Sequence, residues 1–243
     1  MKKFLHPSTR LTTVLLAAAL FSGACSSDKK STVTGPTGSA NPTAPSLSTA
    51  QSYVVLGASA VTNTGATALT GDLGVSSPGI SPTGFPPGTI TGTTHSGDVA
   101  SAQAQTDLTP AYNTLAAKTC DTPMSGLDLG SRTLTQGVYC FTSSAQLTGA
   151  LTLNGSAGSV FIFKIASSLN TASSSSVVMT GGALARNVYW QVGSSATLGA
   201  GTAFKGNIIA LTSISLGTGA SLSGRALARN GAVTMDGNAI SMP

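Results

Sequence analysis

Glutamate is absent from this sequence of 243 residues, and charged residues of all kinds make up only 8% of it. Helical proteins rely on Glu, Lys and Arg, so this composition argues against a mainly helical fold. Aromatic residues are also scarce, at 5%, with a single tryptophan. Disorder requires low hydrophobicity and many charges, whereas 41% of these residues are hydrophobic, so the chain is not of a disordered type.

Small and hydroxylated residues are abundant instead. The sequence contains 34 Ser, 34 Thr and 29 Gly. This composition favours a mainly β architecture of many short strands joined by tight turns.

The formal net charge of +5 is concentrated near the N-terminus. Residues 1–10 contribute +3 and residues 25–46 contribute +1, whereas residues 47–243 carry seven basic and six acidic side chains, 7 − 6 = +1. Nucleic acid is therefore not an expected partner, because its binding depends on a basic surface of the folded domain.

The N-terminus has the three parts of a secretory signal peptide. Lys2 and Lys3 form a basic start, an apolar run occupies residues 11–21, and small residues follow up to Ala24. The apolar run is too short to span a membrane comfortably. We expect residues 1–24 to be a signal peptide and the protein to be exported.

Cys25 follows directly and resembles the processing site of bacterial lipoproteins, where the cysteine is lipidated and becomes the mature N-terminus. By the same resemblance, Ser26 directs the protein to the outer membrane. Ordinary cleavage near Ala24, giving a secreted protein, is the alternative.

Residues 25–46 are polar, include three prolines and lack apolar periodicity, so we interpret them as a tether between a membrane anchor and a domain at residues 47–243.

Cys120 and Cys140 remain as an even pair in the expected domain. Because exported proteins lie where disulfides persist, we expect a bond between them, with two free thiols as the alternative. We expect neither a metal nor another cofactor, since His95 is the only histidine of residues 47–243 and two cysteines 20 positions apart do not form a ligand set.

The C-terminal part repeats itself with a period of 18 to 19 residues. Residues 201–211 align with residues 219–229, and Phe204, Leu222 and Ile240 fall in one column. Such a period accommodates three short strands with their turns, which is one coil of a β-solenoid. A β-sandwich with coincidental similarity is the alternative.

Residues 96–118 differ, being rich in Ala and Gln, and predict a helix packed along the solenoid. Val99, Leu108, Tyr112 and Leu115 are expected to share its buried face. Pro110 leaves two alternatives. Either one helix is kinked there, or two helices lie in line and Thr109 caps the second.

Several blocks, in order, resemble the bacterial and fungal ice-binding proteins. They are residues 54–79, 107–117, 127–141, 158–165 and 206–240. The resemblance implies a right-handed, discontinuous β-solenoid of triangular section, with a long helix alongside and an early block inserted beside later coils. It also implies that one flat face binds ice.

Ice offers a regular array of water molecules, which a flat, charge-poor face of stacked strands can match. Coils repeat at about 4.8 Å and alternate residues at about 6.6 Å, and threonine adds a stiff side chain with a hydroxyl and a methyl. The sequence leaves open which face binds, and we expect a monomer whose partner is the ice surface with its ordered water. The candidate ice-contacting residues are Thr64, Thr67, Ser195, Thr197, Ser213, Ser215, Thr218, Ser221 and Thr234.

An enzyme is not expected, because the six aspartates of residues 47–243 share no motif, Asp72 is interpreted as a turn residue, and His95 as an exposed loop residue. The stronger alternative is a cell-surface structural or adhesive module that binds polysaccharide or neighbouring cells. Sugar binding would call for exposed aromatic rings, and either Tyr189 or Trp190 is expected to face outward, with Tyr139 as a further candidate.

Overall fold

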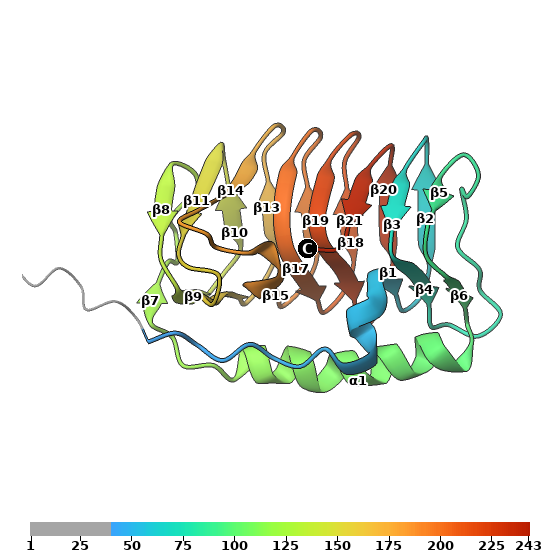
Figure 1. Cartoon of the computed structure of the whole chain (residues 1–243), viewed down its shortest axis with the longest axis horizontal. Helices are drawn as coiled ribbons and strands as arrows, with labels where there is room; N and C mark the ends of the chain where they lie inside the picture. Colours follow the sequence, from blue (N-terminus) through green and yellow to red (C-terminus); the bar gives the residue numbers. More distant parts are fainter. Residues whose placement is uncertain (1–39) are drawn as a thin grey trace, which may run out of the picture. The chain divides into compact units, whose positions relative to one another are not determined.

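The computed structural model describes residues 40–243, which form a solenoid of parallel strands with one long helix beside it (Figure 1). Consecutive coils pair in the register that the repeat predicts. Phe204, Leu222 and Ile240 form one buried column, and β17 (Ala203–Ala210) aligns with β19 (Ser221–Ala228) at an offset of 18. The solenoid prediction is therefore confirmed.

The strands form three faces. The helix face consists of β7 (Thr122–Pro123), β9 (Gly137–Phe141), β12 (Phe161–Ile165), β15 (Val188–Val192), the second halves of β17 and β19, β1 (Tyr53–Gly57), β4 (Asp72–Val75) and β6 (Thr94–Ser96). The long face consists of β8 (Arg132–Leu134), β11 (Ala150–Asn154), β14 (Ser176–Thr180), the first halves of β17 and β19, β21 (Ala239–Ser241), β3 (Ala68–Thr70) and β5 (Thr89–Ile90). The short face is the separate sheet of β10 (Ala145–Leu147), β13 (Leu169–Thr171), β16 (Ala196–Leu198), β18 (Ile214–Leu216), β20 (Val233–Asp236) and β2 (Val61–Thr64).

The coils do not follow one another in chain order. Strands β1, β2 and β3 pair with β19, β20 and β21, so the first block of the domain extends the end formed by its last strands. The helix then returns the chain to the opposite end, where β7 and β8 begin the remaining coils (Figure 1). This arrangement confirms the discontinuous solenoid.

The helix α1 (Val99–Ala116) is a single helix that continues through Pro110, so two helices in line was the wrong alternative. Asp98 caps it by accepting a hydrogen bond from the Ser101 amide at 2.8 Å. Leu108 is buried against the helix face as expected, but Val99 is 87% exposed. Val99 lies nine residues, or two and a half turns, before Leu108, which places the two side chains on opposite sides of the helix.

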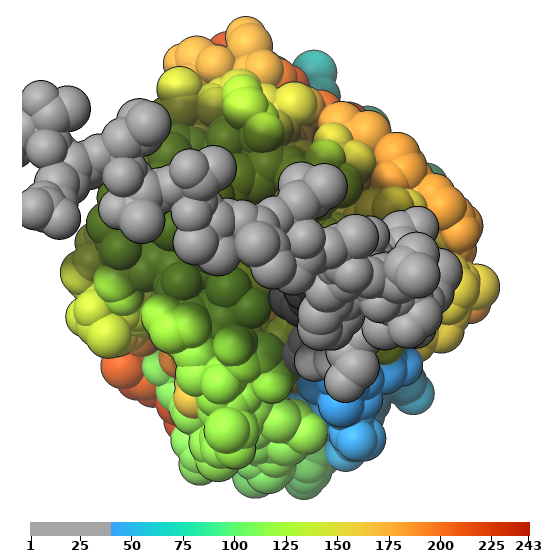
Figure 2. All heavy atoms as spheres, turned by 90° about the vertical axis from the view of Figure 1, so that its left-hand side faces the viewer, coloured from blue at the N-terminus to red at the C-terminus, as the bar shows by residue number. Residues whose placement is uncertain are grey.

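A second layer on the helix face comes from the start of the described chain, including the short helix η1 (Ser48–Ser52). Asn41 accepts a hydrogen bond from the Val160 amide at 2.8 Å and donates one to the Gly158 carbonyl at 2.9 Å. Contacts with the solenoid thus begin before Leu47. In the end view, this blue segment lies next to the green helical side (Figure 2).

The interior is apolar and contains an aromatic stack of Tyr139, Phe163, Trp190 and Phe204. Trp190 is fully buried, and Tyr139 is only 6% exposed. Tyr189 points the other way but is covered on the helix face. The expectation of an outward aromatic ring was therefore wrong, because both sides of β15 are buried.

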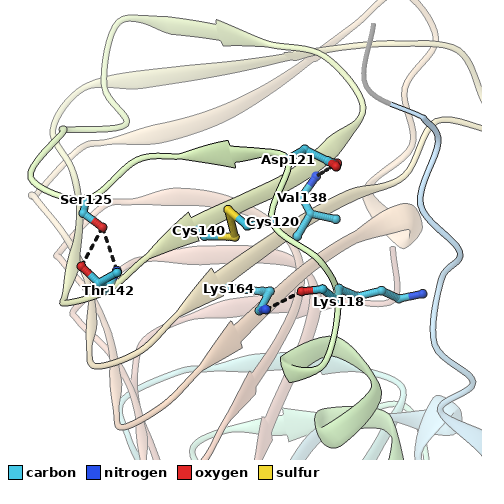
Figure 3. Close-up of a disulfide and its surroundings, with 8 residues drawn as sticks. All are labelled: Lys118, Cys120, Asp121, Ser125, Val138, Cys140, Thr142 and Lys164. Atoms are coloured by element: carbon cyan, nitrogen blue, oxygen red, sulfur yellow. Dashed lines mark hydrogen bonds between the residues drawn. A yellow bond between two sulfur atoms is a disulfide. The ribbon is translucent and has the colours of Figure 1, made fainter.

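The disulfide between Cys120 and Cys140 is present, with Cα atoms 5.9 Å apart. It joins the segment after α1 to β9 at one end of the solenoid (Figure 3). Beside it, the Asp121 carboxylate accepts a hydrogen bond from the Val138 amide at 2.8 Å. Closing this loop stabilises the fold by about 3 kcal/mol in the chain-entropy model.

None of the helices described between residues 40 and 243 has both the length and the apolar character needed to cross a membrane. Cys25 and the predicted signal peptide lie outside the described residues.

Candidate functional site

Only two of the three faces are free. The helix face is covered by α1 and the segment that includes η1, and the side chains between these layers form a second apolar core. A surface that binds an extended, flat ligand must therefore lie on the long face or the short face.

The long face carries two parallel ranks of outward side chains, which follow from the register of its strands. The first rank consists of Ala150, Ser176, Ala203, Ser221, Ala239, Ala68 and Thr89. The second rank consists of Thr133, Thr152, Val178, Lys205, Ser223, Ser241 and Thr70. With coils about 4.8 Å apart and ranks about 6.6 Å apart, these residues make a two-dimensional array.

The long-face array is almost free of charge and of competing hydrogen bonds. Lys205 is its only charged member, and Val178 has nearly the shape of threonine without the hydroxyl. The hydroxyls of Ser223, Ser241 and Thr70 have no hydrogen-bond partner within residues 40–243, so they are available to surface water. A shallow hollow of about 270 Å³ runs over the Ala and Ser side chains beside Lys205.

The short face carries the rank predicted from the repeat. Thr197, Ser215 and Thr234 lie in register on β16, β18 and β20, and the Thr234 hydroxyl is 3.0 Å from that of Ser215. The rank continues through Thr62 and Thr83. Their stacking confirms the predicted register, whereas their role in binding stays a prediction.

The remainder of the short face is less regular. At the other end, the same rank continues into the amides Asn170 and Gln146. Ser195 and Ser213 flank the rank as predicted, but each hydroxyl accepts a hydrogen bond from the backbone of the next coil, at 3.4 Å and 3.3 Å. These hydroxyls are thus partly engaged by the protein itself.

The comparisons with known proteins agree with this geometry. The sequence profile described as ice-binding-like matches residues 55–241. The chain belongs to the ice-binding-like family.

The similarity to individual members of this family is high. An "Ice-binding protein" of Nostoc sp. (strain HG1) is 57% identical over 198 residues, covering 80% of this chain and 73% of that protein. A crystal structure of an ice-binding protein from an Antarctic biological consortium has a TM-score of 0.81 and 48% identity, covering 84% of this chain and 94% of the other. A second crystal structure, of an ice-binding protein from Antarctomyces psychrotrophicus, has a TM-score of 0.80 and 42% identity, covering 83% of this chain and 99% of the other.

The corner between the two free faces of this ice-binding-like domain requires one correction. Thr64 and Thr218 are exposed there, but Thr67 is only 1% exposed and donates a hydrogen bond to the Asn63 side chain at 2.5 Å. The turn Thr64–Thr67, Thr-Gly-Ala-Thr, resembles Thr218–Ser221, Thr-Gly-Ala-Ser, and this likeness would place Thr67 in the Ser221 column. In the structure Ala68 is the residue that shares this column. A shift of one residue turns a strand side chain to the opposite side, so Thr67 points inward and cannot contact ice.

The predicted residues therefore do not form one surface. Ser221 belongs to the long face, whereas Thr197, Ser215 and Thr234 belong to the short face with their flanking serines. The glycine in each corner turn has a positive φ, 77° at Gly65 and 70° at Gly219, which explains why glycine recurs at this edge.

The prediction that His95 is an exposed loop residue was wrong. It lies on β6, its Nδ1 is 2.7 Å from an Asp98 carboxylate oxygen, and its ring centroid is 5.3 Å from that of Tyr53. Burial, with Asp98 nearby, raises the pKa of Tyr53 to about 12. These contacts connect the last strand of the helix face to the cap of α1, which is a structural role.

Asp72 accepts a hydrogen bond from the Thr93 amide at 2.8 Å, which supports its structural interpretation. Within residues 40–243, no group of three His, Cys or acidic side chains is placed to hold a metal ion.

Proposed function

We propose that this protein binds ice and inhibits ice growth and recrystallisation by adsorbing through the long face. The observation that carries the proposal is the two-rank array of Ala, Ser and Thr on that face. Adsorption at many points of a rigid array holds the molecule on the crystal, and the ice between adsorbed molecules then grows only with strong curvature.

The long face is favoured over the short face for three reasons. Its ranks repeat in two dimensions, its central hydroxyls are free, and its strands continue over more coils. The short-face rank through Thr197, Ser215 and Thr234 is the alternative surface. Its repeating hydroxyls lie mainly in one rank, and amides occupy one end.

An adhesive module is less well supported. Sugar binding commonly uses exposed aromatic rings, and among residues 40–243 the only aromatic side chain more than slightly exposed is Phe85. We propose no enzymatic activity and no cofactor, and a domain charge of +1 offers no basis for binding nucleic acid.

We further propose that the protein is an exported monomer held at the outer membrane. Cys25 is the proposed lipid attachment site, residues 1–24 the signal peptide and residues 25–46 the tether, whose last residues pack on the solenoid. Membrane fractionation of wild type and Cys25→Ala tests the anchor. An unchanged membrane fraction in the variant would contradict it.

Thermal hysteresis and recrystallisation inhibition, measured on residues 26–243, test the function. We expect shaped ice crystals and a hysteresis gap that rises with protein concentration. Folded protein that leaves ice crystals unshaped at high concentration would reject the proposal.

A further inference from the structure

A hollow of about 240 Å³ lies on the helix face, away from both free faces. It is bounded by the segment that includes η1 on one side, and by β15 and β19 on the other. Its polar lining residues are Ser46, Gln51, Arg186, Asn187, Tyr189 and Arg225. Two of the few basic residues of the domain thus meet at one small site.

Arg225 is fixed in place by neutral partners. Its Nε and Nη2 donate to the Gln51 carbonyl at 2.9 Å and 2.7 Å, and its Nη1 donates to the Asn207 side-chain oxygen at 2.8 Å. Asn207 is fully buried and is itself held by the Arg186 and Val188 carbonyls, each at 3.1 Å. A guanidinium has five N–H donors, so two donors of a pre-oriented group remain unused.

Arg186 belongs to the short helix η2 (Ala185–Asn187), and its guanidinium has no partner within residues 40–243. No carboxylate lines the hollow, and the one ion pair found in the described chain joins His95 and Asp98 elsewhere. Burial lowers the pKa of Arg225, as expected for a cation without a counter-ion. The site therefore holds two positive charges that no protein group neutralises.

We propose that this hollow binds a small oxyanion that also carries hydroxyl groups, the class that includes sugar acids and sugar phosphates. Guanidinium groups suit carboxylate and phosphate, which accept two parallel hydrogen bonds. Asn187 uses its amide nitrogen on the Ala157 carbonyl at 2.8 Å, which leaves its side-chain oxygen for a ligand hydroxyl. The volume is below the range of about 300–1,000 Å³ that drug-sized ligands occupy, so a single sugar-sized unit fits.

Calorimetric titration of residues 26–243 at low ionic strength tests the site, with glucuronate, glucose 6-phosphate and glucose as separate probes. We expect saturable one-to-one binding of at least one of the two anions and none of glucose. Binding by one anion alone identifies the preferred group. Binding by neither, or equal binding of glucose, overturns the proposal.

Arg186→Gln is the decisive variant, because the Arg186 side chain is exposed and makes no hydrogen bond or ion pair within residues 40–243. We expect affinity to fall about tenfold, the loss of one charge-assisted contact.

Lys205→Gln removes the same charge from the long face and should leave affinity unchanged. An equal loss in both variants would indicate non-specific attraction and reject the site. Arg225→Lys keeps the positive charge but loses the planar pair of guanidinium donors, so it should also weaken binding. Because Arg225 holds the Gln51 carbonyl, thermal unfolding of this variant is measured in parallel. The site does not depend on ice activity, so Arg186→Gln should retain wild-type hysteresis.

Discussion

Phe163 and Trp190 stack face to face inside the solenoid, with ring centroids 3.9 Å apart and ring planes inclined by 9°. They occupy the same inward position on neighbouring strands β12 and β15. Both rings are fully buried, so their contact connects the interior of one coil to that of the next.

We predict that Trp190→Ala lowers the free energy of unfolding by about 3–5 kcal/mol, as for other large-to-small changes of buried aromatic residues. The indole also donates a hydrogen bond to the Lys205 carbonyl at 3.0 Å, which the variant loses. Urea denaturation provides the measurement, with Ser215→Ala on the short face as a surface control. A loss below about 1 kcal/mol would mean that the stack is not an important support of the coils.

A pair of variants on the consecutive strands β20 and β21 tests which of the two free faces binds ice. Ser241→Tyr places a bulky ring in the long-face array, and Thr234→Tyr places the same ring in the short-face rank; both positions are exposed. We predict that Ser241→Tyr removes most of the thermal hysteresis while Thr234→Tyr retains it. Both should unfold within about 0.5 kcal/mol of wild type. The reverse pattern would move the ice-binding surface to the short face.

Lys205 interrupts an otherwise uncharged array, and a hydrated ammonium orders water in its own geometry. We predict that Lys205→Thr raises thermal hysteresis at equal protein concentration, because it extends the hydroxyl rank beside Ser223. Arg186→Thr, which removes a positive charge away from the long face, serves as the control. Unchanged hysteresis in Lys205→Thr would show that ice does not contact this part of the face.

The cap of α1 predicts a pH dependence. The Ser101 amide and His95 lower the pKa of Asp98 to about 2, below its ordinary value of 3.8. A lowered folded-state pKa stabilises the fold above the unfolded pKa, and this contribution is lost as pH falls through the folded value. We therefore expect stability to fall between about pH 4 and pH 2, and less steeply in Asp98→Asn, which keeps a capping side chain. Denaturant unfolding at several pH values measures both slopes, and equal slopes would contradict this role of Asp98.

The solenoid, its register and the helix could be predicted from sequence because each rests on a local or repeating pattern. The column of Phe204, Leu222 and Ile240 fixes which residues are neighbours in successive coils. The corner at Thr67 could not, because a turn that gains or loses one residue leaves the motif recognisable while reversing the side chain.

The long-face array was missed for a related reason. Only Ser221 of its two ranks was among the predicted residues, because Ala203, Ala239 and Ala68 look like ordinary strand residues when each is considered alone. The signal that could have found them is a small outward residue on each side of the buried one in residues 221–223, 239–241 and 68–70, and before it in residues 203–205, where Lys205 takes the second position. Aligning the N-terminal block with the last coils requires the discontinuous order, which the repeat alone does not reveal.

The discontinuous order also has a consequence for biosynthesis. Strands β1, β2 and β3 leave the ribosome early, yet their partners β19, β20 and β21 are the last to be made. Until then, the early block has only its own pairs, β1 with β4, β4 with β6 and β3 with β5, and the edges that later meet β19, β20 and β21 stay unpaired. It can complete its sheet only across nearly the whole length of the chain. An unfinished chain therefore cannot reach the native state, and a premature stop that removes β20 and β21 would leave the early strands β2 and β3 without their C-terminal partners. The export proposed above would suit such a protein if the chain crosses the membrane unfolded, since the domain cannot close before its translation is complete.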